Sequence, residues 1–432
     1  MLCYSKDFLT YGKANIRGET FDFSFADDVF SFFPKEDLSK KYTWKRLTEK
    51  ELSELSIICI PYGEKNLVAE IIGTYDTYIA HDHSLRCNYQ KLFIRHENCR
   101  IDALAFRGPT IDQIVQNLTV RNKLEDGINP LDLTLKTSFN VFGKICDLST
   151  VTRLNNDDST SIGYSSSVFL HFDTSVSTEQ AFLVYDAFIR LVYFLGYRKD
   201  VFLECNSYKI EGKGVFSNGT LYLPHISKNN LNDTSRLISL EAIMPVIGGL
   251  INYILDGNII PLFIPAKKGP SFSDSYILAT AWAQMVFKQV YVPINPNYRL
   301  NKYDVIDFPS KSKVTLEKQL SIMIEETFPY LSDFLEVSSS CIISGVDIHH
   351  YICTDLPKRL KTVRHAIAHG SNQPKDYEYT HLDMIVLLCA IYYSILKKKL
   401  GLDEFHLEFA LSELFFDRTE VSSQWSKLHH NT

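Results

Sequence analysis

The residue types best suited to chemistry lie together between positions 358 and 370, in the sequence KRLKTVRHAIAHG. Arg364 and His369 form an R-x4-H pair, and His365 follows the arginine directly. A guanidinium stays charged and binds phosphate oxygens in a two-pronged way. An imidazole can accept or donate a proton near neutral pH. If the protein is an enzyme, we expect its chemistry at this segment.

Signals for helix ends place the pair in the last turn of a helix predicted at about 355–370. Thr354 or Asp355 is the expected N-cap, and Pro357 would fall in the first turn, where its missing N–H is harmless. Gly370 is the expected residue after the helix end. The two residues of the pair are therefore predicted to sit on a rigid support.

A helical wheel predicts that the histidines face away from the core. At about 100° per residue, the apolar positions fall in one narrow stripe: Leu356, Leu360, Val363 and Ile367. His365 and His369 lie one turn apart on the opposite side, with Arg364 at the flank. Lys358 and Lys361 share the histidines' face. This face is predicted to be basic and to attract an anionic partner, because a basic patch concentrates phosphates.

The elements that position this segment change along the chain. Residues 1–235 read mainly as strands, with one embedded helix at about 178–195, and residues 236–432 read as helices. The segment 227–235, rich in Asn, Asp and Ser, is the predicted domain boundary. The expected fold class is α+β, with a β-rich N-terminal domain followed by an all-α bundle.

The helix predicted at about 380–400 is apolar on nearly every side. Thr380 and Asp383 form a variant of the capping box at its start, and three lysines precede Gly401 at its end. The middle, Met384–Tyr393, has to be covered all round, by its own domain or by a second subunit.

The composition is that of a soluble globular protein of two or three domains, with 432 residues, 45% hydrophobic and 22% charged. A net charge of −6 means that any nucleic-acid contact must be local. The 9 cysteines are scattered, and the N-terminus lacks a signal-peptide pattern, so we expect a cytoplasmic protein with reduced thiols. The apolar stretches 237–264 and 382–396 are interpreted as buried helices, so no membrane is expected.

Two groups of residues offer a metal site as an alternative. His365 and His369 have the i, i+4 spacing of zinc-binding helices, and three further candidate ligands precede them: His349, His350 and Cys353. The glutamate of H-E-x-x-H is absent, and no third ligand is fixed by spacing. The second group, HDHSLRC at 81–87, is interpreted as a polar turn. We expect no metal or other cofactor, and a His-ligated metal hydrolase remains the less favoured alternative.

The C-terminal region, about residues 270–415, resembles the HEPN superfamily, helical domains whose ribonuclease members carry R-x4-H late in a helix. The residue after the arginine is typically Asn, Asp or His in that superfamily, and it is His365 here. A β-rich region with one embedded helix ahead of such a domain is similar to the ApeA type of bacterial abortive-infection protein. That second likeness is one of architecture.

The resemblance implies metal-independent RNA cleavage, in which the ribose 2′-OH attacks the adjacent phosphate and expels the 5′-oxygen. His369 would move a proton, as base or as acid. Arg364 would stabilise the charge of the phosphorane, and His365 would orient the phosphate or tune its neighbours. Lys358 and Lys361 are expected to bind RNA phosphates.

The resemblance also implies a homodimer with a composite active site, because symmetry supplies two copies of His369. RNA is the expected substrate, with tRNA among the candidates, and a phage-derived trigger is expected to act through the N-terminal domain. The alternative is a catalytically silent HEPN-like module for dimerisation or RNA binding. No acidic residue is assigned to the site; Glu325 and Glu326, on a preceding helix, stay unassigned.

Overall fold

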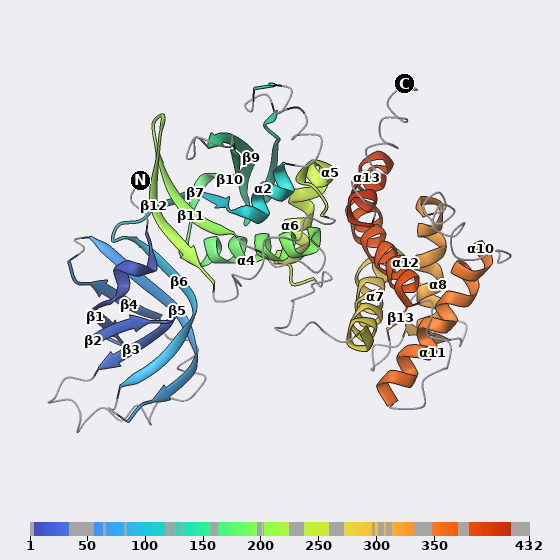
Figure 1. The fold of residues 1–432 in the computed structure, drawn as a ribbon, viewed down its shortest axis with the longest axis horizontal. Helices are drawn as coiled ribbons and strands as arrows, with labels where there is room; N and C mark the ends of the chain where they lie inside the picture. Colours follow the sequence, from blue (N-terminus) through green and yellow to red (C-terminus); the bar gives the residue numbers. More distant parts are fainter. Residues whose placement is uncertain are drawn as a thin grey trace. The chain divides into compact units, whose positions relative to one another are not determined.

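The computed structural model describes most of the chain, in two units. The described residues are 4–33, 56–63, 66–81, 84–116, 123, 127–129, 133–155, 163–196, 201, 203–223, 237–258, 272–295, 299–300, 306–307, 313–331, 348–369 and 380–415. One unit comprises 1–188 with 201–230, and the other 189–200 with 231–432. The predicted boundary at 227–235 lies outside the described residues. The fold is α+β, as predicted (Figure 1).

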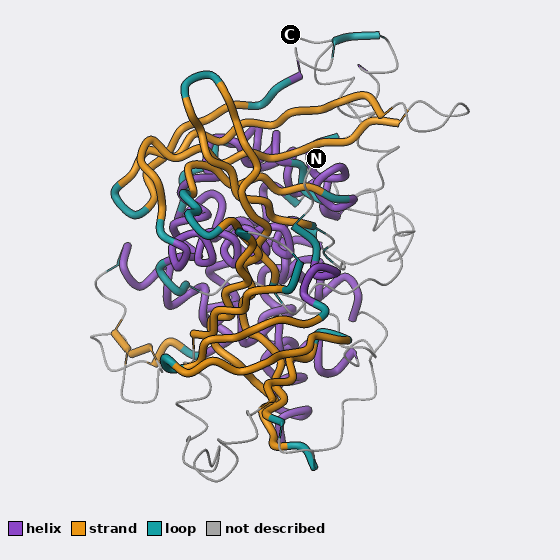
Figure 2. Tube along the Cα trace, turned by 90° about the vertical axis from the view of Figure 1, so that its left-hand side faces the viewer, coloured by secondary structure: helices purple, strands orange, loops and turns teal. Residues whose placement is uncertain are grey.

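The first unit is built on an antiparallel sheet whose described strands run in the order β3-β2-β1-β4-β5-β6-β12-β11-β7-β10-β9-β8. Because β3 also pairs with β6, six strands close on themselves: β1 (Tyr11–Ile16), β2 (Glu19–Ala26), β3 (Val29–Phe33), β4 (Ser56–Pro61), β5 (Leu67–Ile79) and β6 (Leu85–His96). The others continue from β6: β7 (Ile101–Arg107), β8 (Lys136–Val141), β9 (Lys144–Asn155), β10 (Gly163–Val176), β11 (Glu204–Glu211) and β12 (Gly214–Tyr222). These strands are orange in Figure 2.

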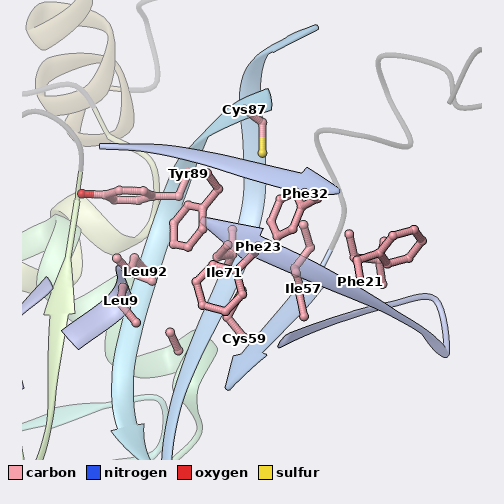
Figure 3. Packing of buried hydrophobic residues seen from close by; sticks show 14 of the residues in the cluster. Leu9, Phe21, Phe23, Phe32, Ile57, Cys59, Ile71, Cys87, Tyr89 and Leu92 are labelled. Carbon is pink, nitrogen blue, oxygen red and sulfur yellow. The ribbon is translucent and has the colours of Figure 1, made fainter. Parts of the chain in front are cut away.

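The closed part of the sheet has its own core because side chains alternate between its two faces. Burial alternates residue by residue along β1 and β4. The inward side chains include four phenylalanines, and the rings of Phe30 and Phe32 stack with centroids 6.0 Å apart. Figure 3 shows Phe23 and Phe32 gathered with Ile57, Ile71 and Tyr89 between the strands. This core holds the closed sheet together through burial of apolar surface.

Two helices accompany the strands of the first unit. Helix α2 (Pro109–Val115) packs against β10 and β7. Helix α4 (Thr178–Leu195) has the bounds predicted for the embedded helix. Phe188 of α4 stacks on Phe106 of β7 at a centroid distance of 3.9 Å, a contact of the kind that adds to simple area burial.

The second unit is mainly helical. Its described elements are the last residues of α4, then α5 (Leu240–Ile243), η5 (Met244–Val246), α6 (Ile247–Leu255), α7 (Phe272–Ile294), α8 (Leu316–Thr327), η6 (Phe328–Tyr330), α10 (Ile348–His350), the π-helix η7 (Tyr351–Asp355), α11 (Leu356–His369), α12 (Thr380–Tyr393), the π-helix η8 (Ser394–Lys399) and α13 (Glu404–Phe415). Three short strands add a small sheet that an all-α prediction did not include: β13 (Arg299–Leu300), β14 (Ile306–Asp307) and β15 (Lys313–Val314).

Helix α12 lies at the centre of the helical packing. It contacts α7, α8 and α13, while α11 contacts α7 and α8 (Figure 1). All but one of the side chains from Met384 to Tyr393 are buried. The ring of Tyr392 stacks on Phe194 of α4 at 4.3 Å, and its hydroxyl donates to the Phe194 carbonyl at 2.5 Å. The apolar helix is therefore covered by its own chain.

None of the helices in the described part of the chain has both the length and the apolar character that crossing a membrane requires.

Candidate functional site

The helix that carries the R-x4-H pair starts earlier than predicted. The helical backbone runs without a break from Ile348 through the π-helix η7 into α11. Thr354 and Asp355 lie inside it, so their predicted role as N-cap is wrong. The N–H of Leu356 donates to the carbonyl of Tyr351, five residues back. This wider turn opens the helix just ahead of Pro357, whose ring crowds the preceding turn and whose nitrogen donates no hydrogen bond.

The faces of α11 follow the helical wheel. Leu356 and Leu360 are fully buried, and Val363 is 6% exposed. His365, Lys358 and Lys361 are exposed on the other side. The side chains of residues 367–369, which include the predicted catalytic His369, lie outside the described residues, although the backbone of His369 is in the last turn of α11.

Arg364 is held from a neighbouring helix. Its Nη1 donates a hydrogen bond of 2.6 Å to Oε1 of Gln284 on α7. The side chain is half-buried, and this burial lowers the pKa of the guanidinium from its ordinary value. The group remains cationic at neutral pH, because arginine starts from a very high pKa. Arg364 is thus a positioned cation at the flank of the histidine-bearing face.

The basic character of the face is weaker than the sequence suggests, because one lysine is paired. Nζ of Lys361 lies 3.0 Å from Oε2 of Glu317 on α8. Both groups are well exposed, and such surface pairs contribute about 0–1 kcal/mol. A phosphate could therefore displace Glu317 at small cost. Lys358, also exposed, lies one turn before Thr362, whose hydroxyl donates to the Lys358 carbonyl.

A buried carboxylate, Asp383, contacts the helix of the R-x4-H pair, although the sequence predicts only a capping role for it. Asp383 of α12 is 0% exposed. The hydroxyl of Tyr351 donates to its Oδ1 at 3.0 Å. Nε of Arg359 forms an ion pair with its Oδ2 at 3.1 Å. That approach lacks hydrogen-bond alignment, and Oδ2 accepts no hydrogen bond from the described residues.

The environment of Asp383 makes its charge costly. Burial raises the pKa of its carboxyl to about 6, although Arg359 and the hydrogen bond from Tyr351 oppose the rise. One sequence signal pointed to it: Asp383 is the only charged residue in the apolar stretch 382–396. A charge at the start of such a helix needs a partner, but the sequence did not identify which one.

The candidate metal ligands do not gather in the described part of the chain, where no group of three or more suitable side chains could hold an ion. The ring of His349 packs edge-on against Phe328 at 4.6 Å, and its Nε2 lies 3.9 Å from Cys353 Sγ. His350 points instead toward Asp355, at 3.9 Å. Of the group at 81–87, residues 82 and 83 lie outside the described residues, and Cys87 is buried in the sheet core.

The two glutamates left unassigned lie on α8. Glu326 accepts a hydrogen bond from the Tyr291 hydroxyl at 3.1 Å and pairs with Lys398 at 3.1 Å. Glu325 is exposed and accepts from Ser321. The two contacts of Glu326 join α8 to α7 and η8, whereas that of Glu325 stays within α8. Among the described residues, no hydrogen bond or ion pair joins either glutamate to Arg364.

The described structure therefore brings Arg364, His365, Lys358 and Lys361 onto one helix and ties this helix to α7, α8 and α12. Comparisons with protein-family models, with curated proteins and with solved structures found no match.

Proposed function

We propose that the second unit contains a HEPN-type endoribonuclease domain that cleaves RNA without a metal ion. The main support is the setting of Arg364, a half-buried cation fixed by Gln284 next to an exposed histidine, His365, on one rigid helix. A fixed cation beside an accessible imidazole suits a reaction in which negative charge develops on a phosphate.

In this reaction the ribose 2′-OH attacks the adjacent phosphorus and the 5′-oxygen leaves, so that a cyclic phosphate forms. Arg364 stabilises the charge on the phosphorane oxygens. His369 takes the proton from the 2′-OH or gives one to the leaving oxygen. His365 orients the phosphate, and Lys358 and Lys361 attract the RNA backbone.

The active form is proposed to be a homodimer with a composite site. A single His369 cannot act as base and acid at once, and a two-fold axis supplies a second copy. Exposed apolar residues on α7 support this arrangement. Leu278 and Met285, which are 41% and 43% exposed, lie seven residues apart on one face of the helix that also carries Gln284.

The order of the two units supports a role of the ApeA type in bacterial anti-phage defence. A β-rich unit comes first and the helical unit follows. The first unit would sense a phage-derived trigger in the cytoplasm and restrain the nuclease until infection, because an unrestrained ribonuclease harms its host. RNA, with tRNA among the candidates, is the substrate.

The test compares the full chain with Arg364→Ala and His369→Ala, in bacterial cells during phage infection and as purified protein with a chelator. Each variant should lower cleavage by about 100-fold or more, and the products should carry a cyclic phosphate. His406→Ala is the matched control, since His406 lies on α13 and pairs with Asp403 at 2.7 Å. Loss of cleavage on chelation, or undiminished cleavage by both variants, contradicts the proposal.

A further inference from the structure

The buried carboxylate of Asp383 contacts the helix of the R-x4-H pair at the first residue of its π-helical segment and again beyond the end of that segment. Tyr351 is the first residue of η7, and Arg359 lies in the first turn of α11, beyond the segment's end at Asp355. Both contact the same carboxylate, at 3.0 and 3.1 Å. Asp383 thus spans the irregular part of the helix and belongs to a different helix, α12.

Because Asp383 contacts the π-helical segment η7 (the π-segment), it can influence the direction of the side chains that follow on α11. A π turn takes up one residue more than an α turn, and one residue corresponds to about 100° of rotation. The length of η7 therefore sets the direction in which every later side chain of α11 points, including Arg364 and His365. A regular α-helix from Ile348 onward would turn these side chains away from their present positions.

Stability alone does not account for Asp383. Burial removes the Asp383 carboxylate and much of the Arg359 side chain from water, which is unfavourable for charged groups. Apolar residues of similar volume are often equally or more stable in such a place. Here the cost is high, since Oδ2 accepts no hydrogen bond from the described residues and the carboxylate is fully buried. What Asp383 supplies is a pair of polar contacts with two particular residues, Tyr351 and Arg359, which apolar side chains would not supply.

We propose that Asp383 is a positioning residue, which holds Tyr351 and Arg359 across the π-segment and so fixes the rotation of α11 that presents Arg364 and His365. Its effect on RNA cleavage rests on the proposed ribonuclease function. Its effect on the helix does not, and can be measured without RNA.

The decisive variant is the apolar pair Asp383→Leu with Arg359→Met in the full chain. Amide hydrogen exchange should rise by about tenfold or more in residues 351–360, while the unfolding free energy stays equal or increases. Cleavage should lose kcat with little change in KM, because an interaction made in the transition state is weakened. Asp403→Asn, which neutralises an exposed carboxylate near α13, is the matched control and should leave both measurements unchanged.

Tyr351→Phe and Asp383→Asn retain the shape of the site and serve if the apolar pair fails to fold. Each should raise exchange in the same segment. Unchanged exchange and unchanged cleavage in a folded variant overturn the proposal. If the wild-type chain cleaves no RNA under any condition, the proposed function fails, and the exchange data alone then decide whether Asp383 positions the helix.

Discussion

Nη1 of Arg364 lies 2.6 Å from Oε1 of Gln284, which joins the motif helix α11 to α7. A long flexible side chain held in one place loses less entropy when it binds a phosphate, because the ordering has already occurred on folding. The amide of Gln284 is neutral, so this contact holds Arg364 in place without compensating its positive charge. A carboxylate in its place would compete with the phosphate.

We expect Gln284→Ala to lower kcat for RNA cleavage by about tenfold, because Arg364 loses its support, with a change of about 1 kcal/mol in the unfolding free energy. Gln289→Ala is the control. Gln289 lies on the same helix and accepts a hydrogen bond from Tyr253 at 2.6 Å, away from the motif. Equal loss of activity in both variants would show that the integrity of α7 matters and the contact with Arg364 does not.

The ion pair between Lys361 and Glu317 gives a second prediction. Glu317→Gln releases the ammonium of Lys361, which lies 3.0 Å away. RNA should then bind more tightly at low salt, and the slope of log K against log salt should steepen by up to about one. Fluorescence anisotropy with a short single-stranded RNA measures both. Lys361→Ala should weaken RNA binding, and the double variant Lys361→Ala with Glu317→Gln should weaken it to the same extent. Tighter RNA binding by the double variant than by Lys361→Ala alone would contradict this explanation.

The faces of α11 could be predicted because they depend on local periodicity. Leu356, Leu360 and Val363 recur at helical spacing, and burial of that stripe follows wherever the helix packs. The partners of Asp383 could not be predicted in the same way. Tyr351 and Arg359 reach it through tertiary packing, and a charge at the third helical position also fits a capping box, which the sequence alone favours.

The π-segment was missed for a related reason. Pro357 close to Thr354 and Asp355 is typical of a helix start, and the same sequence also fits a widened turn that accommodates proline inside a longer helix. Only the packing of residues 348–355 decides between the two. The fold class could be predicted, since strand-like and helix-like patterns separate along the chain, but closure of the first sheet depends on the pairing of β3 with β6.

The buried carboxyl of Asp383 predicts an unusual pH dependence of stability. Burial raises its pKa to about 6 from an ordinary 3.8, so the folded state binds the proton more tightly than the unfolded state. The unfolding free energy should therefore fall as pH rises from about 4 to 7. Each pKa unit corresponds to about 1.4 kcal/mol, so the contribution is on the order of 3 kcal/mol.

Urea unfolding followed by helical circular dichroism at several pH values tests this prediction. Asp383→Asn should flatten the dependence between pH 4.5 and 7, whereas Asp403→Asn should not. The pKa of Asp403 is lowered by hydrogen bonds from His406, despite some burial, so its contribution has the opposite sign. Identical slopes in wild type and Asp383→Asn would contradict the assignment.

Asp102, in the first unit, should make the unfolding free energy change with pH in the opposite direction. Burial alone would raise the pKa of its carboxyl, but hydrogen bonds from the Ile210 N–H, the Ser175 hydroxyl and Arg100 hold it below its ordinary value. Its stabilisation is therefore present above the unfolded pKa and is lost as pH falls through the folded value. Asp102→Ala should reduce the unfolding free energy by about 2–4 kcal/mol. Asp173→Ala, an exposed position on β10, should have little effect.

The proposed homodimer with a composite site predicts that a charge on the exposed face of α7 separates the subunits. Met285 is 43% exposed, so Met285→Asp should leave the fold of one chain intact and still oppose burial against a second copy. Light scattering should show a dimer for the wild type and a monomer for the variant, with cleavage reduced by about 100-fold, because each half-site lacks its second His369. Leu183→Asp, a 40% exposed position on α4, is the matched control and should stay dimeric and active. A wild-type chain that is monomeric at all concentrations yet cleaves RNA would exclude the two-subunit site and leave a single α11 as the catalytic element.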